Sequence, residues 1–243
     1  MATYESFAEV YDLFMDNVPY DVWKTHLLDI LGQYHITDGL VAELGCGTGK
    51  MTRRLAEAGY DMIGIDNSYD MLSIAMEHPA EDILYLCQDM RAFELYGTVA
   101  AVISVCDSMN YLTSRSDMEL TIKAVHSQLR DGGIFIFDMK TASFYKDELG
   151  NNVFADRAGR VSYVWQNHYD EKTHINTYDI TFYRRIFANI CLSCREKHRQ
   201  RAYSVKQIKD IAAKCGMELL EHTVRGERAY YILKKQAIVK RSV

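Results

Sequence analysis

Residues 41–50 have the sequence V-A-E-L-G-C-G-T-G-K, in which an apolar run leads into three closely spaced glycines. Glycine adopts backbone conformations that are closed to other residues, and it lets a ligand approach main-chain atoms. The apolar run 39–44 predicts a buried strand, and the stretch 48–58, which Gly59 ends, predicts a helix. A strand, a glycine loop and a helix in this order indicate a nucleotide-type site in an α/β protein.

Strands and helices alternate on both sides of this loop. Helices are expected before it at 4–15 and 20–34, and further strands and helices are expected after it at 61–66, 69–77, 83–88, 98–106, 116–129 and 134–137. Continuously apolar strands are typical of a parallel sheet that is covered on both faces. Right-handed crossovers then give a doubly wound α/β fold.

The pattern changes after Asp138. Residues 152–190 are rich in Tyr, Val, Thr, Phe and Ile, and they predict antiparallel strands with a tight turn at 170–173. A helix capped by Ser204 and a terminal hairpin follow, and the hairpin brings the main sheet to seven strands. We therefore predict one α/β domain with a β-rich insertion. The domain is expected at 1–140 and 204–243, and the insertion at 141–203.

Composition excludes several other classes of protein. Of the 243 residues, 48% are hydrophobic and 25% are charged, and 2 Pro and 14 Gly leave no low-complexity tract. Three of the six cysteines fall at predicted strand ends or in the glycine loop, which favours free thiols over a disulfide framework. The sequence has no signal-peptide pattern, and its longest uncharged run, residues 95–106, is too short to cross a membrane. We expect a cytoplasmic protein.

Charge is distributed unevenly along the chain. Residues 1–100 carry 5 Lys or Arg against 17 Asp or Glu, whereas residues 101–243 carry 23 against 16. The densest basic stretch, 195–209, could contact an anion or a nucleic acid, or it could be the solvated face of a strand and a helix. The solvated face is favoured, because the chain has a net charge of −5 and no set of aromatic residues is interleaved there.

A carboxylate follows the glycine loop at the distance expected of a nucleoside site. Asp66 ends the next predicted strand, 17 residues beyond Gly49, where it could accept hydrogen bonds from ribose hydroxyls. A dinucleotide fingerprint would need a glycine at position 50, which is Lys50, so a nicotinamide oxidoreductase is disfavoured. Glu43, before the loop, would disfavour a pyrophosphate and suits a ligand with a cationic centre.

Three segments taken together, E-L-G-C-G-T-G (43–49), I-G-I-D-N-S (63–68) and C-Q-D-M (87–90), resemble the class I S-adenosylmethionine-dependent methyltransferases. The resemblance covers about residues 5–140, and it is closest to small bacterial members with an N-terminal F-A-E-V-Y-D…P-Y…W segment. It implies a Rossmann-like fold with a reversed last strand, and it implies that the insertion at 141–203 covers the acceptor site. It also implies S-adenosylmethionine as the cofactor, whose ammonium and sulfonium groups suit the acid before the loop, and transfer of its methyl group to an acceptor.

The resemblance further implies which residues hold the cofactor. The main chain of Gly45, Cys46 and Gly47 would line the methionine moiety, and Asp66 would hold the ribose hydroxyls. The other implied positions are Asn67 and Met71 flanking the adenine, Asp89 and the Met90 main chain at its amino edge, Cys106 on the sulfonium side, and Tyr11, Tyr20 and Trp23 covering the cofactor from the N-terminal helices. For these three aromatic residues, simple helix packing is an equal alternative.

We find no sharp catalytic signature, and none is required, because the sulfonium already activates the methyl group and the protein mainly aligns the reactants. An alcohol or phenol acceptor would need a base. The candidates are Asp107 after the fourth strand and His168 and Tyr169 in the insertion, and a structural role is favoured for Asp107 and His168. Asn110 and Tyr111 are expected either to line the acceptor pocket or to pack locally.

Several sharper chemistries are disfavoured. The run Asp107-Ser108-Met109-Asn110 lacks the prolines of the adenine- and glutamine-methylating members, and Cys106 lacks the proline and second acid of a nucleophile that attacks a pyrimidine ring. A magnesium site at Asp107 and Asp138 would lack a clear third ligand. Cys191 and Cys194 form a C-x-x-C pair that would need two further ligands to bind zinc. We predict no metal.

The sequence therefore predicts an enzyme that methylates a small molecule with S-adenosylmethionine. Two alternatives stay open. One is an RNA-modifying methyltransferase that uses the basic stretch 195–209, and the other is an S-adenosylmethionine-binding module without catalysis.

Overall fold

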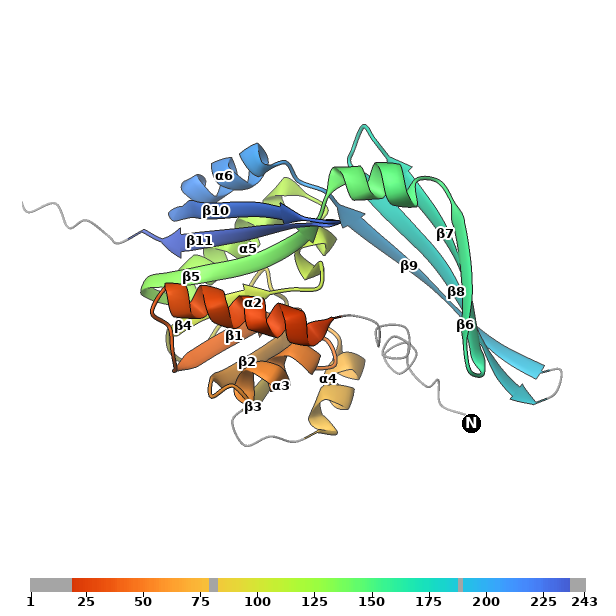
Figure 1. Cartoon of the computed structure of the whole chain (residues 1–243), viewed down its shortest axis with the longest axis horizontal. Coiled ribbons are helices and arrows are strands. Elements are labelled where there is room, and N and C mark those ends of the chain that lie inside the picture. The colour runs from red at the N-terminus through yellow and green to blue at the C-terminus, as the bar shows by residue number, and fades with distance from the viewer. Residues whose placement is uncertain (1–18, 79–82, 188–189, 237–243) are drawn as a thin grey trace, which may run out of the picture.

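The computed structural model describes residues 19–78, 83–187 and 190–236, so the predicted helix at 4–15 lies outside the described residues. The chain forms two sheets of different construction, with helices packed against the larger one (Figure 1). The α-helices are α2 (Tyr20–Gln33), α3 (Lys50–Ala56), α4 (Tyr69–Met76), α5 (Arg115–Gln128) and α6 (Val205–Lys214). Within these described ranges, no helix is long and apolar enough to span a bilayer.

The larger sheet has seven strands in the order β10-β11-β5-β4-β1-β2-β3. Neighbouring strands run parallel except at β11, which is antiparallel to both β5 and β10. The predicted doubly wound, mostly parallel sheet is confirmed. Its strands are β1 (Leu40–Leu44), β2 (Asp61–Asp66), β3 (Ile83–Cys87), β4 (Val99–Ser104), β5 (Leu129–Lys140), β10 (Met217–Arg225) and β11 (Arg228–Lys235).

Both faces of this sheet are buried by helices, and side chains alternate between the two faces along each strand. On β5, Phe135 and Phe137 join a core with residues of α5 and α6, whereas Ile134 and Ile136 join a second core with residues of α2 and α3. None of these four side chains is more than 1% exposed. Burial on both faces explains why the central strand β4, which is buried along its whole length, is almost entirely apolar.

The order of strands reverses at β1, which pairs with β2 on one side and with β4 on the other. Loops that leave the carboxyl ends of adjacent strands diverge at such a point and open a crevice for a ligand. The glycine loop follows β1, and a turn that contains Asp107 follows β4. The strand order therefore determines where a site can form.

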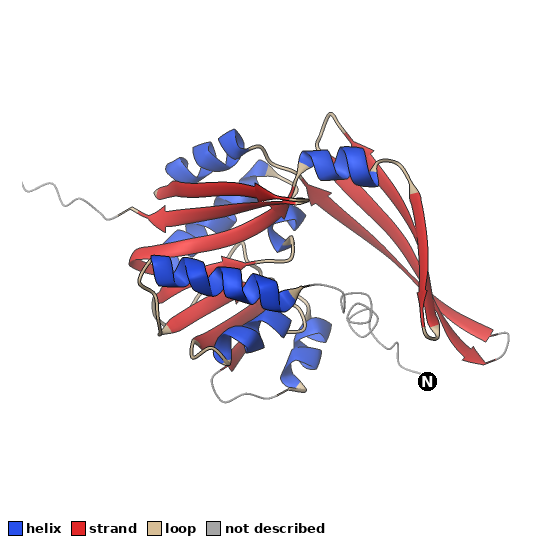
Figure 2. Cartoon of the chain, viewed as in Figure 1, coloured by secondary structure: helices blue, strands red, loops and turns tan. Residues whose placement is uncertain are grey.

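A second sheet of four antiparallel strands extends from the first as a twisted arm (Figures 1 and 2). At the predicted turn between its second and third strands, the Asp170 carboxylate accepts hydrogen bonds from the Lys172 amide and the Thr173 hydroxyl. The predicted antiparallel strands are confirmed, while the limits of the insertion stay a prediction. In spatial order, the strands of the arm are β6 (Val153–Ala158), β7 (Val161–Asp170), β8 (Ile175–Phe187) and β9 (Ile190–Arg201).

The end of β4 and the start of β5 are among the strand boundaries that differ from the sequence prediction. Strand β4 ends at Ser104 rather than at 106, and Cys106 and Asp107 adopt left-handed backbone conformations with φ of 60° and 56°. Strand β5 begins at Leu129 and includes residues 131–133, which were expected to end the preceding helix. The glycine at position 132 has φ of 76°, a conformation that most other residues avoid.

Arg228, at the start of β11, is the centre of a buried ion-pair cluster. Its guanidinium lies 2.7 Å from Asp138 of β5 and 2.8 Å from Asp107, and it packs over the ring of Trp23 on α2. Arg228 is 6% exposed and Asp138 is 1% exposed. Burial raises the pKa of Asp138, and the positive charge of Arg228 opposes that shift. The cluster joins the reversed strand to the carboxyl ends of β4 and β5.

Arg228→Met should destabilise the fold by about 3–5 kcal/mol, because it leaves buried carboxylates without their cation. Urea unfolding at neutral pH measures this loss as a lower midpoint at an unchanged slope. Adding Asp138→Asn should restore part of the stability, because it removes one uncompensated charge. Lys206→Met, which breaks a surface pair with Asp210 on α6, is the control and should leave the midpoint nearly unchanged. An equal loss in the Arg228 and Lys206 variants would contradict the prediction.

Candidate functional site

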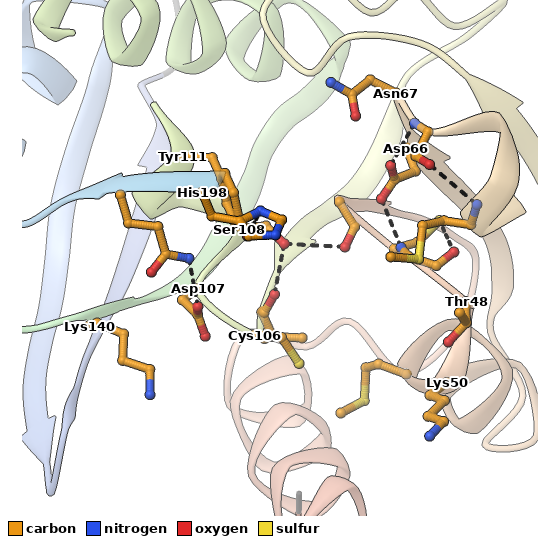
Figure 3. A pocket seen from close by; sticks show the side chains of 18 of the residues that line it. Thr48, Lys50, Asp66, Asn67, Cys106, Asp107, Ser108, Tyr111, Lys140 and His198 are labelled. Atoms are coloured by element: carbon orange, nitrogen blue, oxygen red, sulfur yellow. Dashed lines mark hydrogen bonds between the residues drawn. The ribbon is translucent and has the colours of Figure 1, made fainter. Parts of the chain in front are cut away.

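A cavity of about 770 Å³ lies at the carboxyl ends of β1, β2 and β4, between the seven-stranded sheet and the arm. One half of its lining comes from the glycine loop, the end of β2 and the loop after β3. The other half comes from the arm and from the segment that precedes it. Figure 3 shows the turn after β4 between these two halves. The cavity therefore occupies the crevice that the strand order predicts.

The glycine loop forms one wall of the cavity. Gly45, Gly47 and Gly49 have φ of 67°, 55° and 73°, which lie in the left-handed region that favours glycine. The amides of Gly45 and Cys46 both donate to the carbonyl of Ile65, at 2.7 and 3.1 Å. These bonds hold the loop against β2, so that its residues line the cavity in a fixed conformation.

Asp66 ends β2 beside the loop. Its Oδ2 accepts a hydrogen bond from the Gly47 amide, and its Oδ1 accepts one from the Ser68 amide, both at 2.9 Å. Each carboxylate oxygen keeps a further lone pair, and Asp66 lines the cavity. The side chain can therefore accept hydrogen bonds from two neighbouring hydroxyls of a ligand, as a ribose would require.

Four residues predicted around an adenine line the cavity beyond Asp66: Asn67, Met71, Asp89 and Met90. The Ser68 hydroxyl caps α4 by accepting a hydrogen bond from the Met71 amide, and this bond fixes the first turn of the helix. The side chain of Arg91 hydrogen-bonds to Asp89, which lowers the pKa of that carboxyl, so Asp89 is ionised at neutral pH.

Glu43, the last polar residue of β1 before the loop, is a buried carboxyl that lines the cavity. Its Oε2 accepts a hydrogen bond from the Thr52 hydroxyl. Burial raises the pKa of Glu43 to about 8. The carboxyl is therefore mostly protonated at neutral pH, and a cationic ligand in the cavity would favour its ionised form.

The turn after β4 separates the two halves of the cavity. The Ser108 hydroxyl donates to the Gly45 carbonyl at 3.2 Å, and a Cβ on Gly45 would lie only 2.4 Å from that hydroxyl oxygen. Asp107 pairs with Arg228 through one oxygen and accepts a hydrogen bond from Gln200 of β9 through the other, each at 2.8 Å. One carboxylate therefore connects the main sheet to the arm.

Cys106 lines the cavity next to Asp107. Burial raises the pKa of its thiol well above the ordinary value, and this keeps the sulfur protonated. A protonated thiol is a poor nucleophile. The buried, protonated thiol of Cys106 is therefore unsuited to act as a nucleophile.

The arm supplies aromatic and polar side chains to the second half of the cavity. Residues two apart on a strand share a face, and alternate residues of β7, β8 and β9 line the cavity. The sequence analysis did not identify these residues, although their period-two spacing was the available signal. They are Tyr163 and Trp165 on β7, Tyr178, Ile180 and Phe182 on β8, and Glu196, His198 and Gln200 on β9, and Tyr111, Phe144 and Leu149 lie beside them.

Most of the residues predicted to hold a cofactor lie together in this cavity. Trp23 instead packs on Arg228, with the guanidinium 4.8 Å from its ring, and Tyr11 lies outside the described residues. The predicted cofactor residues that line the cavity are Tyr20, Glu43, Gly45, Cys46, Gly47, Asp66, Asn67, Met71, Asp89, Met90 and Cys106.

The predicted acceptor and catalytic residues divide into two groups. Asp107 and Tyr111 line the cavity. Asn110 is fully buried, and its side chain donates to the carbonyls of Lys140 and Arg201, at 3.2 and 2.9 Å, which is a packing role.

His168 and Tyr169 do not lie among the residues that line the cavity. His168 is exposed on β7, three residues from the inward-facing Trp165 and therefore on the opposite face. Tyr169 is buried, and its hydroxyl lies 3.2 Å from Nδ1 of His174. Neither side chain is placed to touch a ligand in the cavity, so neither enters the function proposed below.

The basic stretch 195–209 is divided between β9 and α6, and several of its cations are paired within the chain. Arg195 forms two bonds to Asp179, at 2.7 and 2.6 Å, and Lys206 pairs with Asp210 at 2.7 Å. All six cysteines are free thiols. Over the part of the chain that the structure describes, no group of three or more His, Cys, Asp or Glu side chains is arranged to hold a metal ion.

Comparisons with known proteins agree with this geometry. A family model described as a methyltransferase domain matches residues 41–133. The chain is 31% identical to the methyltransferase YqeM of Bacillus subtilis strain 168, over 97% of this chain and 98% of that protein. An S-adenosylmethionine-dependent methyltransferase from Clostridium acetobutylicum superposes with a TM-score of 0.82 and 26% identity, covering 95% of this chain and 98% of that chain. A sugar N-methyltransferase from Streptoalloteichus, KedS8, shares the fold with a TM-score of 0.82 at 17% identity, covering 93% of each chain.

The raised pKa of Glu43 should make the stability of the ligand-free protein depend on pH. Because the folded-state pKa of about 8 exceeds the ordinary value of 4.5, the contribution of Glu43 is fully present below pH 4.5 and is lost as the pH rises through 8. Relative to wild type, Glu43→Gln should therefore gain stability between about pH 5 and pH 9, by at most about 1.4 kcal/mol per pH unit.

Urea unfolding across this pH range measures the effect. Glu57→Gln, at the exposed end of α3, is the matched control and should follow wild type at every pH. A difference between Glu43→Gln and wild type that stays constant with pH would show that Glu43 keeps an ordinary titration in the folded protein.

Proposed function

The chain belongs to the S-adenosylmethionine-dependent methyltransferases, and from that membership we propose that it methylates the amine nitrogen of a small molecule held against the arm. The main support is that a single cavity joins two differently lined halves. The cofactor half is lined by the glycine loop, the end of β2 and the loop after β3, and the aromatic half is lined by the arm and the segment that precedes it. A methyl donor and an acceptor can therefore meet without a movement of either sheet.

The residues of the first half fit S-adenosylmethionine, which supplies an activated methyl group. Asp66 would bind the ribose hydroxyls, and the main chain of Gly45, Cys46 and Gly47 would line the methionine moiety. Glu43 would face the cationic groups, where its ionised form would be favoured. Asn67, Met71, Asp89 and Met90 would surround the adenine, and Cys106 and Tyr20 would lie at the sulfonium side and over the open face. The chain thereby orients the reacting atoms and excludes water.

The size and chemistry of the second half favour a small acceptor. The whole cavity, at about 770 Å³, lies within the range of about 300–1,000 Å³ that is usual for small-molecule sites. Rings from β7 and β8 provide broad apolar surfaces, and Glu196, His198 and Gln200 provide polar groups at one side. This combination suits a compact molecule that has both apolar surface and hydrogen-bonding groups.

Charge favours a cationic acceptor. Seven Asp or Glu residues line the cavity, against three Lys or Arg. An acidic, aromatic lining attracts protonated amines, since the faces of Trp and Tyr rings also attract cations. The fold is one that a sugar N-methyltransferase also uses, which agrees with an amine acceptor although it does not identify one.

The same charges count against RNA as the acceptor. An acidic lining would repel a phosphate backbone, and Arg195 and Lys206 of the basic stretch are already paired within the chain. The charge of the cavity does not distinguish an enzyme from a binding module without catalysis. A measurement of methyl transfer distinguishes the two.

Asp66→Asn should remove most of the stabilisation that S-adenosylmethionine gives to the wild-type protein. At a ligand concentration of 100 Kd, wild type should gain about 2.7 kcal/mol, because the ligand binds only the folded state. Thermal unfolding with S-adenosylmethionine, S-adenosylhomocysteine and NAD measures this, and NAD should give no shift. Asp61→Asn, at the exposed start of the same strand, is the control. An unchanged shift in Asp66→Asn would show that the ribose lies elsewhere.

Transfer of a tritiated methyl group from S-adenosylmethionine to fractionated cell extract tests the activity. We expect product in the small-molecule amine fraction. Trp165→Ala should lower kcat/KM at least about tenfold, the equivalent of losing about 1.4 kcal/mol of ring contact, while the thermal shift with S-adenosylmethionine stays the same. Val164→Ala, the neighbouring position on β7, is the control, because Val164 does not line the cavity.

The other outcomes of this assay separate the rivals. Methylation confined to RNA, with binding that weakens steeply with salt, would support the RNA-modifying alternative. Binding of S-adenosylmethionine without transfer to any fraction would support the non-catalytic module.

A further inference from the structure

A chain of polar side chains crosses the wall of the cavity from the turn after β4 to strand β9. The hydroxyl of Tyr111 lies 3.3 Å from Nδ1 of His198, and Nε2 of His198 lies 3.0 Å from a carboxylate oxygen of Glu196. All three residues line the cavity, and the rings of Tyr111 and His198 meet edge to face. Figure 3 shows Tyr111 and His198 beside Ser108 and Asp107.

Two local features of the fold bring these residues together. Glu196 and His198 are two residues apart on β9 and therefore share its inward face. Tyr111 ends the short helix η1 (Ser108–Tyr111), whose first residue hydrogen-bonds to the Gly45 carbonyl. Tyr111 is thus one helical turn away from the glycine loop. Its side chain is 49% exposed, so a ligand in the cavity can reach it.

Asp107 is less suited to accept a proton, although it lies nearby. One of its oxygens pairs with the Arg228 guanidinium and the other accepts a hydrogen bond from Gln200, both at 2.8 Å. Both carboxylate oxygens of Asp107 are therefore already engaged by other side chains of the protein. The structure therefore commits Asp107 to connecting the two sheets.

Methyl transfer leaves a proton to be removed. An amine that arrives protonated first loses a proton to solvent. The lone pair of the neutral acceptor nitrogen then forms the new bond to the methyl carbon while the carbon–sulfur bond breaks and its electron pair stays on sulfur. The methylated nitrogen then carries one proton more than a neutral amine. A group that takes this proton inside the cavity prevents the product from being held there as a cation against the acidic lining.

We propose that Tyr111, His198 and Glu196 receive this proton, a role that rests on the proposed function because it requires an acceptor with an N–H group. The Tyr111 hydroxyl accepts the proton from the nitrogen and passes its own proton to Nδ1 of His198. The Glu196 carboxylate, 3.0 Å from Nε2, then stabilises the positive charge of the imidazolium that forms. Tyr111 touches the acceptor and is the catalytic residue, whereas His198 and Glu196 act through it and are positioning residues.

The ionisable groups that face the pair come from several elements. Glu196 faces His198 from β9, Tyr178 is its partner in the register of β8, and Asp107 faces Tyr111 from the turn after β4. The pH profile of kcat should therefore be determined by these groups together, and it should change when His198 is replaced.

The test compares tritium transfer from S-adenosylmethionine to the small-molecule amine fraction by wild type, Tyr111→Phe, His198→Gln and Glu196→Gln, between about pH 6 and pH 9. We expect Tyr111→Phe and His198→Gln to lower kcat at least about tenfold and Glu196→Gln to lower it less, since general-base contributions are about 10²–10⁴-fold. His198→Gln should also change the shape of the pH profile of kcat. The thermal shift with S-adenosylmethionine should not change in any variant.

His168→Gln is the matched control, because His168 lies on the opposite face of the same arm and should behave as wild type. If His198→Gln and Tyr111→Phe kept the wild-type rate and pH profile, the proton-transfer role would be overturned while the proposed function stood. If wild type transferred no methyl group to any amine fraction, the proposed function would fail, and this role would fail with it.

Discussion

The buried contact between Arg228 and the carboxylates of Asp107 and Asp138 is the interaction on which the arrangement of the cavity depends. It fixes the left-handed turn after β4, and through Asp107 and Gln200 it also fixes the base of the arm. Together with Asn110, which bonds to the main chain of both β5 and β9, it holds the two sheets facing each other across a fixed gap. The cost of burying the charges of Arg228 and Asp138 is offset only because they are paired and hydrogen-bonded, so the geometry of this cluster admits little variation.

The two halves of the cavity solve different physical problems. The cofactor half is built mainly from main chain and short side chains, which the glycine loop and Asp66 hold in place through backbone amides. Such a wall is rigid and leaves few degrees of freedom to order when a ligand binds. The other half is built from large rings on an open antiparallel sheet, which offer contact area without demanding one ligand shape. Under the proposed function, a rigid wall would hold the methyl donor and a more adaptable wall, on the other sheet, would hold the acceptor.

Local chemistry made much of this predictable from sequence. Three features each fall within about 30 residues of chain: the apolar strands, the three loop glycines and the carboxylate of Asp66. From these local patterns the sheet and most residues of the glycine-loop wall could be inferred. The Arg228 cluster could not be inferred from the sequence, because Asp138 lies 90 residues from Arg228 and no local sequence pattern indicates that the two side chains pair. The inward face of the arm was missed for another reason. Both faces of β7–β9 carry polar and aromatic residues, so alternation alone does not say whether His168 or His198 faces the ligand. The Trp23 ring, for which packing and cofactor contact were equal alternatives, packs on Arg228.

The alternation of side chains along the arm has a consequence for how such a protein could change over time. Substitutions at every second position of β7, β8 and β9 alter the lining of the cavity and leave the outer surface and the main sheet untouched. Insertion or deletion of a single residue within these strands would do the opposite, because it would exchange the lining for the solvent-facing side chains in one step. New specificities are therefore accessible by point changes, whereas the length of each strand is under strict constraint.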